Sequence, residues 1–306
     1  MKVIVTGATG FIGSRLCAAL EASGHEPLAL SRRPSDAQSR LAVLAGAYEW
    51  SPLNDAPPLE AFEGVDAVVH LAGESVSGRW TPEKKRAIRE SRVQGTRHLV
   101  DALERLDTKP RVLVSASAIG IYGDRDDEEL TEDSALGSDF LAQVCQEWET
   151  EAQRAEASGI RVVNPRIGLV LGPDGGALDA MMTPFKLGVG GPMGSGRQWW
   201  AWVHRDDAVG IIQNALENEN LSGPINATAP NPERQRDFAK ALGRVLRRPA
   251  FMPAPAFALK LLLGEFAGEL LGSRRVLPER AQQTGYAFRY SELEPALRAI
   301  LKGGRS

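Results

Sequence analysis

Three glycines near the start of the chain have the spacing of a phosphate-binding turn. The segment TGATGFIG at 6–13 places Gly7, Gly10 and Gly13 after an apolar run and before a segment with helical periodicity. Gly7 permits a tight turn, Gly10 lets the backbone approach a pyrophosphate, and Gly13 lets a helix pack closely against a strand. The positive end of that helix would face the phosphates. The motif predicts a dinucleotide site.

The end of the next apolar run indicates which nicotinamide dinucleotide binds. It reads LALSRRP, with Ser31, Arg32 and Arg33 and no acid before Asp36. An acid at this place would bind the ribose hydroxyls of NAD and would repel a 2′-phosphate. A hydroxyl and two forked guanidinium groups suit a phosphate monoester. We therefore expect NADP(H) as cofactor; the alternative is an ordinary basic turn before Pro34.

These side chains need a sheet to position them, and the chain predicts one. Short, uniformly apolar runs are typical of strands that are buried on both faces. They occur at 3–7, 27–31, 67–73, 112–117 and 161–171. Helix-length amphipathic segments lie between them, near 12–23, 82–105 and 139–157. The predicted fold class is α/β, a Rossmann-type doubly wound parallel sheet with helices on both faces.

The pattern changes after residue 171. A segment rich in Gly, Pro and Met suits an excursion away from the sheet, and from Asn231 onward the pattern is mostly helical. We expect a smaller, mainly helical C-terminal lobe, with the substrate between the two parts. The predicted division is an NADP-binding Rossmann domain at 1–170 plus 204–230, and a substrate or lid lobe at 171–203 plus 231–306.

Composition argues against several classes of function. The formal net charge is -3 and the charges are interspersed, so we expect no nucleic-acid partner. Cys17 and Cys145 form no CxxC pair, so we expect no metal site and a reducing, cytoplasmic location. The first apolar run begins at Lys2 without a basic leader or cleavage site, so we expect no export signal.

The longest apolar stretch, FALKLLLGEFAGELL at 257–271, is interrupted by Lys260 and Glu265. It is too polar to span a bilayer, so we expect an amphipathic helix packed on the core and no membrane partner. The partners that we consider are a small-molecule substrate, which the sequence does not name, and a second copy in a homodimer.

Further motifs resemble a known superfamily. With HLAG at 70–73 and SASAIGIYG at 115–123, the glycine spacing resembles the extended short-chain dehydrogenases/reductases. Segments such as GRWTPEKK (78–85), SRVQGT (91–96) and LVLGPDGGAL (169–178) are similar to one atypical subgroup of epimerase-family proteins with its own C-terminal domain. The similarity covers essentially the whole chain. Together with the glycine turn and the basic turn, it implies a cofactor site formed by Gly7, Thr9, Gly10, Phe11, Ile12, Gly13, Ser31, Arg32, Arg33, Leu71, Ala72, Gly73, Arg92, Ser115, Ala116 and Ile167.

Most catalytic residues of that superfamily are absent. Its members use a Tyr to exchange the substrate proton, a Lys four residues later that lowers the tyrosine pKa, a Ser that orients the substrate, and a supporting Asn. The matching positions are Leu141, Cys145, Ser117 and Arg92. The resemblance therefore implies a catalytic role for Ser117 alone, with Arg92 as a cation that faces the cofactor. The usual Tyr–Lys mechanism is not available.

Other side chains could replace the missing proton donor. Glu74 follows HLAG at the cofactor cleft, where it could be a general base or a loop cap. Tyr122 could donate a proton or be structural, and Cys145 could be a reactive thiol or an apolar filler. His204 could be catalytic or could anchor the HRDD turn. The sequence leaves these alternatives open.

Tryptophans in the expected loops bear on the substrate. Trp80, Trp199, Trp200 and Trp202 could pack the two parts together, or they could form an apolar wall for a flat or hydrophobic substrate. A sugar nucleotide would instead need basic groups from the second lobe, for which Arg197 is the main candidate. Two hypotheses remain: an NADP(H)-dependent oxidoreductase or epimerase-like enzyme, and a non-catalytic NADP(H)-binding sensor or scaffold.

Overall fold

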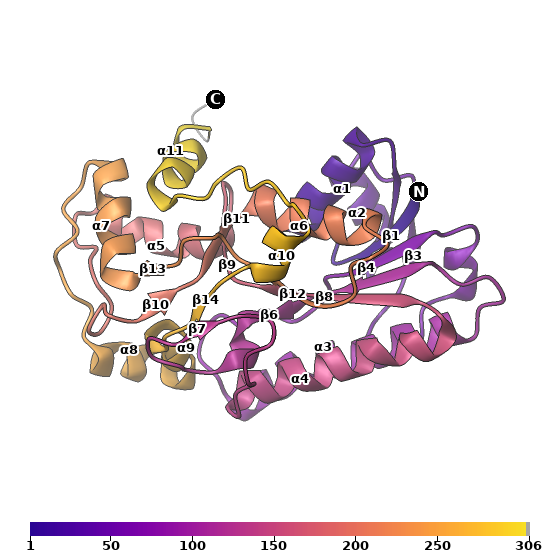
Figure 1. Ribbon diagram of the computed structural model, residues 1–306, viewed down its shortest axis with the longest axis horizontal. Coiled ribbons are helices and arrows are strands. Elements are labelled where there is room, and N and C mark those ends of the chain that lie inside the picture. The colour runs from indigo at the N-terminus through magenta and orange to yellow at the C-terminus, as the bar shows by residue number, and fades with distance from the viewer. Residues whose placement is uncertain (304–306) are drawn as a thin grey trace.

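Residues 1–303 are described by the computed structural model, and a parallel β-sheet forms their centre (Figure 1). The strand order is β12-β8-β5-β4-β1-β2-β3, and the short β6 pairs with β8. The strands are β1 (Lys2–Thr6), β2 (Glu26–Ser31), β3 (Gly46–Glu49), β4 (Ala67–His70), β5 (Val112–Ser115), β6 (Ser117–Ala118), β8 (Arg161–Ile167) and β12 (Gly223–Ala227). The chain runs from β1 outward to β2 and β3, and then crosses back to β4 on the other side of β1, which opens a crevice at the carboxyl ends of β1 and β4.

Helices cover both faces of this sheet. α1 (Gly13–Ala22) and α6 (Arg205–Glu217) pack on one face, and α3 (Pro82–Glu104) and α4 (Phe140–Gln153) pack on the other, below the sheet in Figure 1. Val3 and Val5 belong to the first core and Ile4 to the second, because successive side chains of a strand point to opposite faces. This double burial explains the uniformly apolar strands and confirms the predicted fold class.

Local capping residues begin the two long helices. The side chain of Thr81 accepts a hydrogen bond from the N–H of Lys84 at 3.2 Å, and Pro82 occupies the first turn of α3. Asp139 accepts from the N–H of Ala142 at 2.9 Å and begins α4. A 3-10 turn, η3 (Arg154–Ser158), follows α4. Both helices therefore lie where the sequence predicts them.

A second core forms the C-terminal lobe. α5 (Gly176–Lys186), α7 (Gln235–Leu246) and α11 (Leu293–Gly303) pack around Trp200 and Trp202, and Trp202 has no exposed surface. Two short ladders support them, formed by β9 (Leu169–Leu171) with β11 (Trp202–His204) and by β10 (Trp199–Trp200) with β13 (Glu233–Arg234). Trp200 and Trp202 are therefore packing residues of the lobe.

The chain returns to the sheet before its last helix. β14 (Arg275–Val276) pairs with β7 (Glu129–Leu130), and α10 (Glu279–Gln283) lies against β12. Buried Asp207 of α6 accepts hydrogen bonds from the N–H groups of Arg289 at 2.8 Å and Tyr290 at 3.0 Å. The two-part division of the chain stays a prediction, and this returning segment contacts the part that carries the sheet.

The stretch at 257–271 does not form the core helix that its sequence predicts. α8 (Ala256–Leu263) ends where Gly264 takes a φ of +61°, and a 3-10 turn, η4 (Gly264–Phe266), leads into α9 (Ala267–Leu271). α8 buries none of its residues. The prediction is wrong because the glycine turn divides the stretch into two short helices, and only the second reaches the core. No helix within residues 1–303 combines the length and apolarity that crossing a bilayer requires.

Candidate cofactor and substrate site

The three glycines form the turn between β1 and α1. Gly7 has a φ of +68°, and a Cβ there would lie 3.0 Å from the backbone of Leu71. A Cβ on Gly13 would overlap the carbonyl oxygen of Gly7, so only glycine lets α1 begin against the turn. Gly10 is exposed, and a Cβ there would meet only that same oxygen, at 3.1 Å. No side chain among residues 1–303 caps the start of α1, which leaves this positive end of the helix open to an anion.

A buried histidine joins this turn to the rest of the sheet. Nδ1 of His70 lies 2.7 Å from Oγ1 of Thr6, and Nε2 lies 3.1 Å from Oγ1 of Thr96 on α3. The same Thr6 oxygen accepts the N–H groups of Leu71 and Ala72, each at 3.1 Å. Burial, assisted by the charge of nearby Arg92, lowers the pKa of His70 to about 4, so the ring is neutral at pH 7. The HLAG motif contained this positioning residue, but its role was not predicted.

Ser31, Arg32 and Arg33 lie at the carboxyl end of β2. The register of β1 with β2 places them beside the glycine turn. Oγ of Ser31 accepts the N–H of Arg33 at 3.2 Å. Both arginines are exposed, and the guanidinium of Arg33 lies 3.7 Å from Asp36, a pair too exposed to hold it firmly. Two adaptable cations therefore border the crevice where a 2′-phosphate would lie.

The hydroxyl of Ser117 is buried without a hydrogen-bond partner. Ser117 is 3% exposed, and its Oγ has no partner among the described residues; the same is true of Oγ of Ser115. β6 holds Ser117 opposite Arg166 of β8, and the next pair in register is Ala118 and Ile167. Buried hydroxyls are normally hydrogen-bonded, so an unpaired one at the carboxyl end of the sheet indicates a place for a ligand oxygen.

Arg92 reaches from α3 to the loop after β4. Its Nη1 donates to the carbonyl oxygens of Glu74 at 2.9 Å and Ile88 at 3.1 Å, and its guanidinium lies 5.2 Å from the ring centroid of Trp148. A Cβ on Gly73 would lie 3.2 Å from the guanidinium carbon. Burial lowers the pKa of Arg92, although a guanidinium stays charged at neutral pH. A cation therefore lies directly behind the Gly73 backbone.

Leu141 and Cys145 lie on the buried face of α4 and present no acid or base. Leu141 belongs to an apolar cluster with Trp80. The ring of Trp80 packs edge-on against that of Phe140, with 5.2 Å between the ring centroids, and also contacts the ring of Phe266. Burial raises the pKa of Cys145 to about 12, so its thiol is neutral at pH 7. This environment suits the apolar-filler interpretation of Cys145 better than the reactive one.

Two of the other candidate proton donors are engaged elsewhere. Glu74 is paired with Nζ of Lys84 at 2.7 Å. The hydroxyl of Tyr122 is fully buried, donates to Oδ1 of Asn226 at 2.7 Å, and accepts from Arg166 at 3.0 Å. Burial raises the pKa of Tyr122 as well. These contacts favour the loop and structural interpretations.

Comparison with known proteins shows which family has this arrangement. Residues 3–227 match the NAD dependent epimerase/dehydratase family. The chain belongs to this family. Residues 254–300 match a further domain of unknown function, DUF1731.

Similar proteins match along nearly their whole length. The epimerase family protein SDR39U1 homolog, chloroplastic, of Arabidopsis thaliana is 44% identical over 99% of this chain and 87% of its own. The epimerase family protein YfhF of Bacillus subtilis is 40% identical over 98% of both chains. A crystal structure of the human epimerase family protein SDR39U1 (isoform2) with NADPH superposes with a TM-score of 0.89 at 35% identity, covering 99% of each chain. The superfamily resemblance that the motifs suggested is thereby confirmed.

In this family member, the turn from β11 into α6 closes over the glycine turn. The guanidinium carbon of Arg205 lies 4.8 Å from the ring centroid of Phe11. Nδ1 of His204 accepts the N–H of Asp206 at 3.0 Å, and its ring stacks on Tyr290 at 3.9 Å. Burial lowers the pKa of His204, so this ring caps α6 as a neutral acceptor. The anchoring interpretation of His204 therefore fits its contacts.

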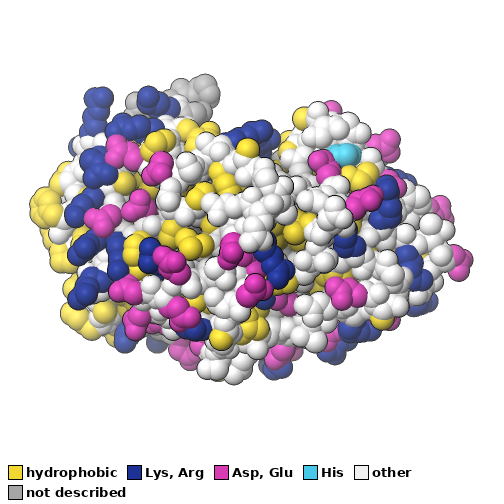
Figure 2. Space-filling view, viewed as in Figure 1, with side chains coloured by type: hydrophobic (Ala, Val, Ile, Leu, Met, Phe, Trp, Pro, Cys, Tyr) yellow, Lys and Arg dark blue, Asp and Glu magenta, His cyan; other side chains and the backbone are white. Residues whose placement is uncertain are grey.

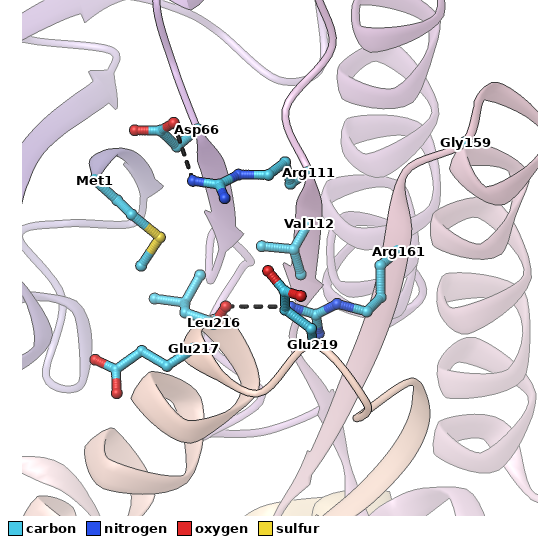
Figure 3. Close-up of a pocket in the computed structure, with 9 residues that line it drawn as sticks. All are labelled: Met1, Asp66, Arg111, Val112, Gly159, Arg161, Leu216, Glu217 and Glu219. Carbon is cyan, nitrogen blue, oxygen red and sulfur yellow. Dashed lines mark hydrogen bonds and ion pairs between the residues drawn. The ribbon is translucent and has the colours of Figure 1, made fainter.

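A hollow lies at the amino ends of the strands, opposite the glycine turn, and its residues have structural roles (Figure 3). Asp66, Arg111 and Arg161 line it from the amino ends of β4, β5 and β8. Asp66 pairs with Arg111 at 3.3 Å, and Nη1 of Arg161 donates to the carbonyl oxygens of Ala215 and Leu221 at 2.8 and 2.7 Å. The bonds from Arg161 hold the end of α6 and the segment that follows it. Ligand sites of doubly wound sheets lie at the carboxyl ends of the strands, where the glycine turn is.

Proposed function

We propose that this protein binds NADP(H) at the carboxyl ends of β1, β2 and β4 and uses it in oxidoreductase or epimerase-like chemistry on a small molecule. The exposed Gly10 and the uncapped start of α1 suit the pyrophosphate, and Arg32 and Arg33 suit the 2′-phosphate. The human relative crystallised with NADPH supports this cofactor. When bound, NADP(H) supplies or accepts a hydride.

The unpartnered hydroxyl of Ser117 carries the proposal of catalysis. Burying a hydroxyl without a hydrogen-bond partner costs free energy of folding. A substrate oxygen that accepts a hydrogen bond from Ser117 would recover that free energy. That bond would orient the reacting group. Arg92 adds positive charge behind Gly73, which favours negative charge that develops nearby during the reaction.

The reaction must proceed without a proton donor on α4. Leu141 has no ionisable group, and Cys145 keeps its proton with a pKa of about 12. We therefore propose that Ser117 orients the substrate oxygen and that water exchanges the proton. This arrangement predicts slow turnover, because a positioned general acid commonly contributes about 10²–10⁴-fold.

The side chains around Leu141 favour an apolar substrate over a sugar nucleotide. Trp80, Phe140 and Phe266 surround this position, so the wall that they form with Leu141 is hydrophobic. Arg197, the candidate for binding a sugar nucleotide, is exposed in the loop before β10. A flat or hydrophobic carbonyl compound or quinone suits this environment better.

Turnover of NADPH tests the enzymatic proposal. The purified protein is assayed for NADPH oxidation with a panel of carbonyl compounds, quinones and sugar nucleotides. Ser117→Ala should reduce kcat about tenfold or more without changing NADPH affinity, because it removes one orienting hydrogen bond. Cys145→Ala is the matched control and should behave like the wild type. Loss of activity in the cysteine variant with none in the serine variant would overturn the assignment.

A non-catalytic NADP(H) sensor or scaffold is the second candidate. Leu141 and Cys145 stand where the superfamily has its Tyr and Lys, which favours this candidate, because a catalytic pocket usually retains an acid or base. NADPH binding without turnover of any compound in the panel, in wild type and Ser117→Ala alike, would support this candidate.

We also propose a reducing, cytoplasmic location. Cys17 and Cys145 are free and buried, and burial raises the pKa of each to about 12. The two thiols form no disulfide, and proteins without disulfides are typical of a reducing compartment.

A further inference from the structure

The C-terminal lobe exposes large apolar side chains in two segments. Phe251, Phe257, Leu261 and Leu262 are each more than 70% exposed, and so is Leu187. Val189 and Met252 are about half exposed in the same two segments. Scattered apolar residues on a surface need no explanation, but a group of this size does. α8, which carries three of these side chains, buries none of its residues.

Backbone hydrogen bonds hold the two segments together, so these side chains form one surface. The N–H of Met252 donates to the carbonyl oxygen of Gly190 at 3.3 Å, and that of Ala254 donates to Pro192 at 2.8 Å. The N–H of Gly194 donates back to Ala254 at 2.9 Å. We call the exposed residues Leu187, Val189, Phe251, Met252, Phe257, Leu261 and Leu262 the apolar patch.

Basic residues border this patch. Arg236, Lys240, Arg244, Arg247 and Arg248 line a hollow on α7 together with Phe251 of the patch. In Figure 2 a column of Lys and Arg runs down the left side of the molecule, with hydrophobic side chains at its outer edge. The figure thus agrees with a basic border beside exposed apolar residues. Lys260 lies within α8 itself.

Few acids neutralise this border. Among the described residues, Asp237 pairs with Arg236 and Lys240, and Glu294 pairs with Arg244. No ion pair within residues 1–303 engages Arg247 or Arg248. The surface is therefore both strongly apolar and positive, although the whole chain carries a net charge of -3.

We propose that the apolar patch and its basic border bind the surface of an anionic phospholipid bilayer. Protruding Phe and Leu side chains enter the boundary between headgroups and acyl chains, and Lys and Arg contact the lipid phosphates. The basic border supplies electrostatic attraction and the apolar patch supplies hydrophobic burial, so the two provide independent attractions. Since no helix among residues 1–303 could cross a bilayer, the proposed contact is with the bilayer surface.

A second copy of this chain fits the surface less well. A two-fold dimer formed through the patch would bring the basic border of one copy close to the basic border of the other. The side chains of α8 also protrude, whereas a protein partner is generally recognised by fitted hollows and knobs. A fluid lipid surface accepts protruding side chains without shape complementarity.

Binding to a bilayer would bring the apolar cluster around Leu141 near the lipid. Arg79 donates from Nη1 to the carbonyl oxygen of Leu261 at 3.4 Å, and the next residue, Trp80, belongs to the apolar cluster around Leu141. α8 therefore connects the patch to the loop that borders the candidate site. The membrane proposal does not depend on catalysis, since a sensor would use the same surface.

Co-sedimentation with vesicles tests the proposal. The full-length protein is mixed with vesicles of phosphatidylcholine, or of an equimolar mixture with phosphatidylglycerol. We expect binding to the anionic vesicles only, and we expect added salt to weaken it. The double variants Phe257→Ser/Leu261→Ser and Arg247→Glu/Arg248→Glu should each bind about tenfold more weakly or worse.

Matched variants elsewhere control for general effects. Leu53→Ser/Leu136→Ser removes two exposed leucines outside the patch, and Arg86→Glu/Arg105→Glu reverses one exposed charge on α3 and one directly after it. Both should bind like the wild type, and circular dichroism should show that all four variants are folded.

Three results would overturn the proposal. One is no binding of the folded wild type to anionic vesicles. Another is equal binding by the patch variants and the control variants. The third is self-association in sedimentation velocity that Phe257→Ser/Leu261→Ser abolishes, because the patch would then belong to a dimer.

Discussion

At the residue scale, the cofactor crevice depends on side chains that make few contacts of their own. Arg32 and Arg33 are exposed, and Gly10 leaves space where any side chain would intrude. Residues of this kind contribute little to stability and are free to bind. Their substitution should therefore change ligand affinity while the fold persists.

Replacing the two arginines should remove the preference between cofactors. NADPH should bind the wild type at least about tenfold more tightly than NADH, which corresponds to about 1.4 kcal/mol. Arg32→Ala/Arg33→Ala should bring the two affinities together, because the 2′-phosphate loses its cationic partners. Calorimetric titration with both cofactors measures this. Arg40→Ala, an exposed arginine at the end of α2 (Pro34–Arg40), is the control and should keep the preference. Equal affinities in the wild type would contradict the assignment.

Gly10→Val should abolish NADPH binding and leave the fold intact. The added side chain meets one carbonyl oxygen of the protein but occupies the approach to the pyrophosphate. Gly13→Ala should instead destabilise the protein, because its Cβ would overlap the carbonyl oxygen of Gly7. Titration and thermal unfolding separate the two effects. A folded Gly10→Val protein with normal NADPH affinity would show that this segment is an ordinary turn without a role in cofactor binding.

At the element scale, His70 connects β1, β4 and α3 through two threonine hydroxyls. The network sets the position of the glycine turn relative to Leu71 and Ala72. It works with a neutral ring, because the pKa of His70 is about 4. An unfolded chain would take up a proton near pH 6.5 while the folded one would not. The stability from this neutral ring is present above pH 6.5 and is lost as the pH falls towards 4.

His70→Gln should therefore reduce the dependence of stability on acid. Between pH 7 and pH 5 the wild type should lose about 1–2 kcal/mol of unfolding free energy through this residue. The glutamine variant should lose correspondingly less unfolding free energy over this range, whatever its absolute stability, because the side chain at position 70 no longer titrates. Urea unfolding at both pH values measures the difference. Identical pH dependence in wild type and His70→Gln would contradict the buried, neutral state.

At the scale of the whole molecule, one buried carboxylate fastens the returning C-terminal segment to α6. Asp207 is fully buried and accepts hydrogen bonds from Tyr286, Arg289 and Tyr290. Tyr286 also packs closely on Gly210, where a Cβ would overlap its hydroxyl. The segment thus joins the sheet to α11 and the core of the C-terminal lobe.

Asp207→Ala should destabilise the whole protein by about 2–4 kcal/mol. The substitution leaves two backbone N–H groups and a phenol without their shared acceptor. Chemical unfolding monitored by tryptophan fluorescence measures the loss. Asp206→Ala is the neighbouring control, and it should cost less because Asp206 is partly exposed and pairs with Arg15 on the surface. Equal losses in both variants would remove the special role of Asp207.

The sequence by itself determined the features that depend on local patterns. Uniformly apolar runs predicted five strands of the parallel sheet, since a strand buried on both faces cannot alternate. β3 was not predicted, because GAYE is short and only partly buried. The glycine spacing located the turn at the start of α1. These features are local because turn geometry and strand burial are properties of a few consecutive residues.

Only the tertiary structure decided which contacts each candidate side chain makes. Tyr122 was an open candidate until its partner Asn226 came from a distant segment, and Glu74 until the start of α3 brought Lys84 to it. The link from His70 to Thr96 and the exposure of α8 were also not visible in the sequence. The reason is physical: availability for chemistry depends on burial and on hydrogen bonds between residues far apart in the chain. Residue type and spacing do not determine those contacts; packing of the folded chain does.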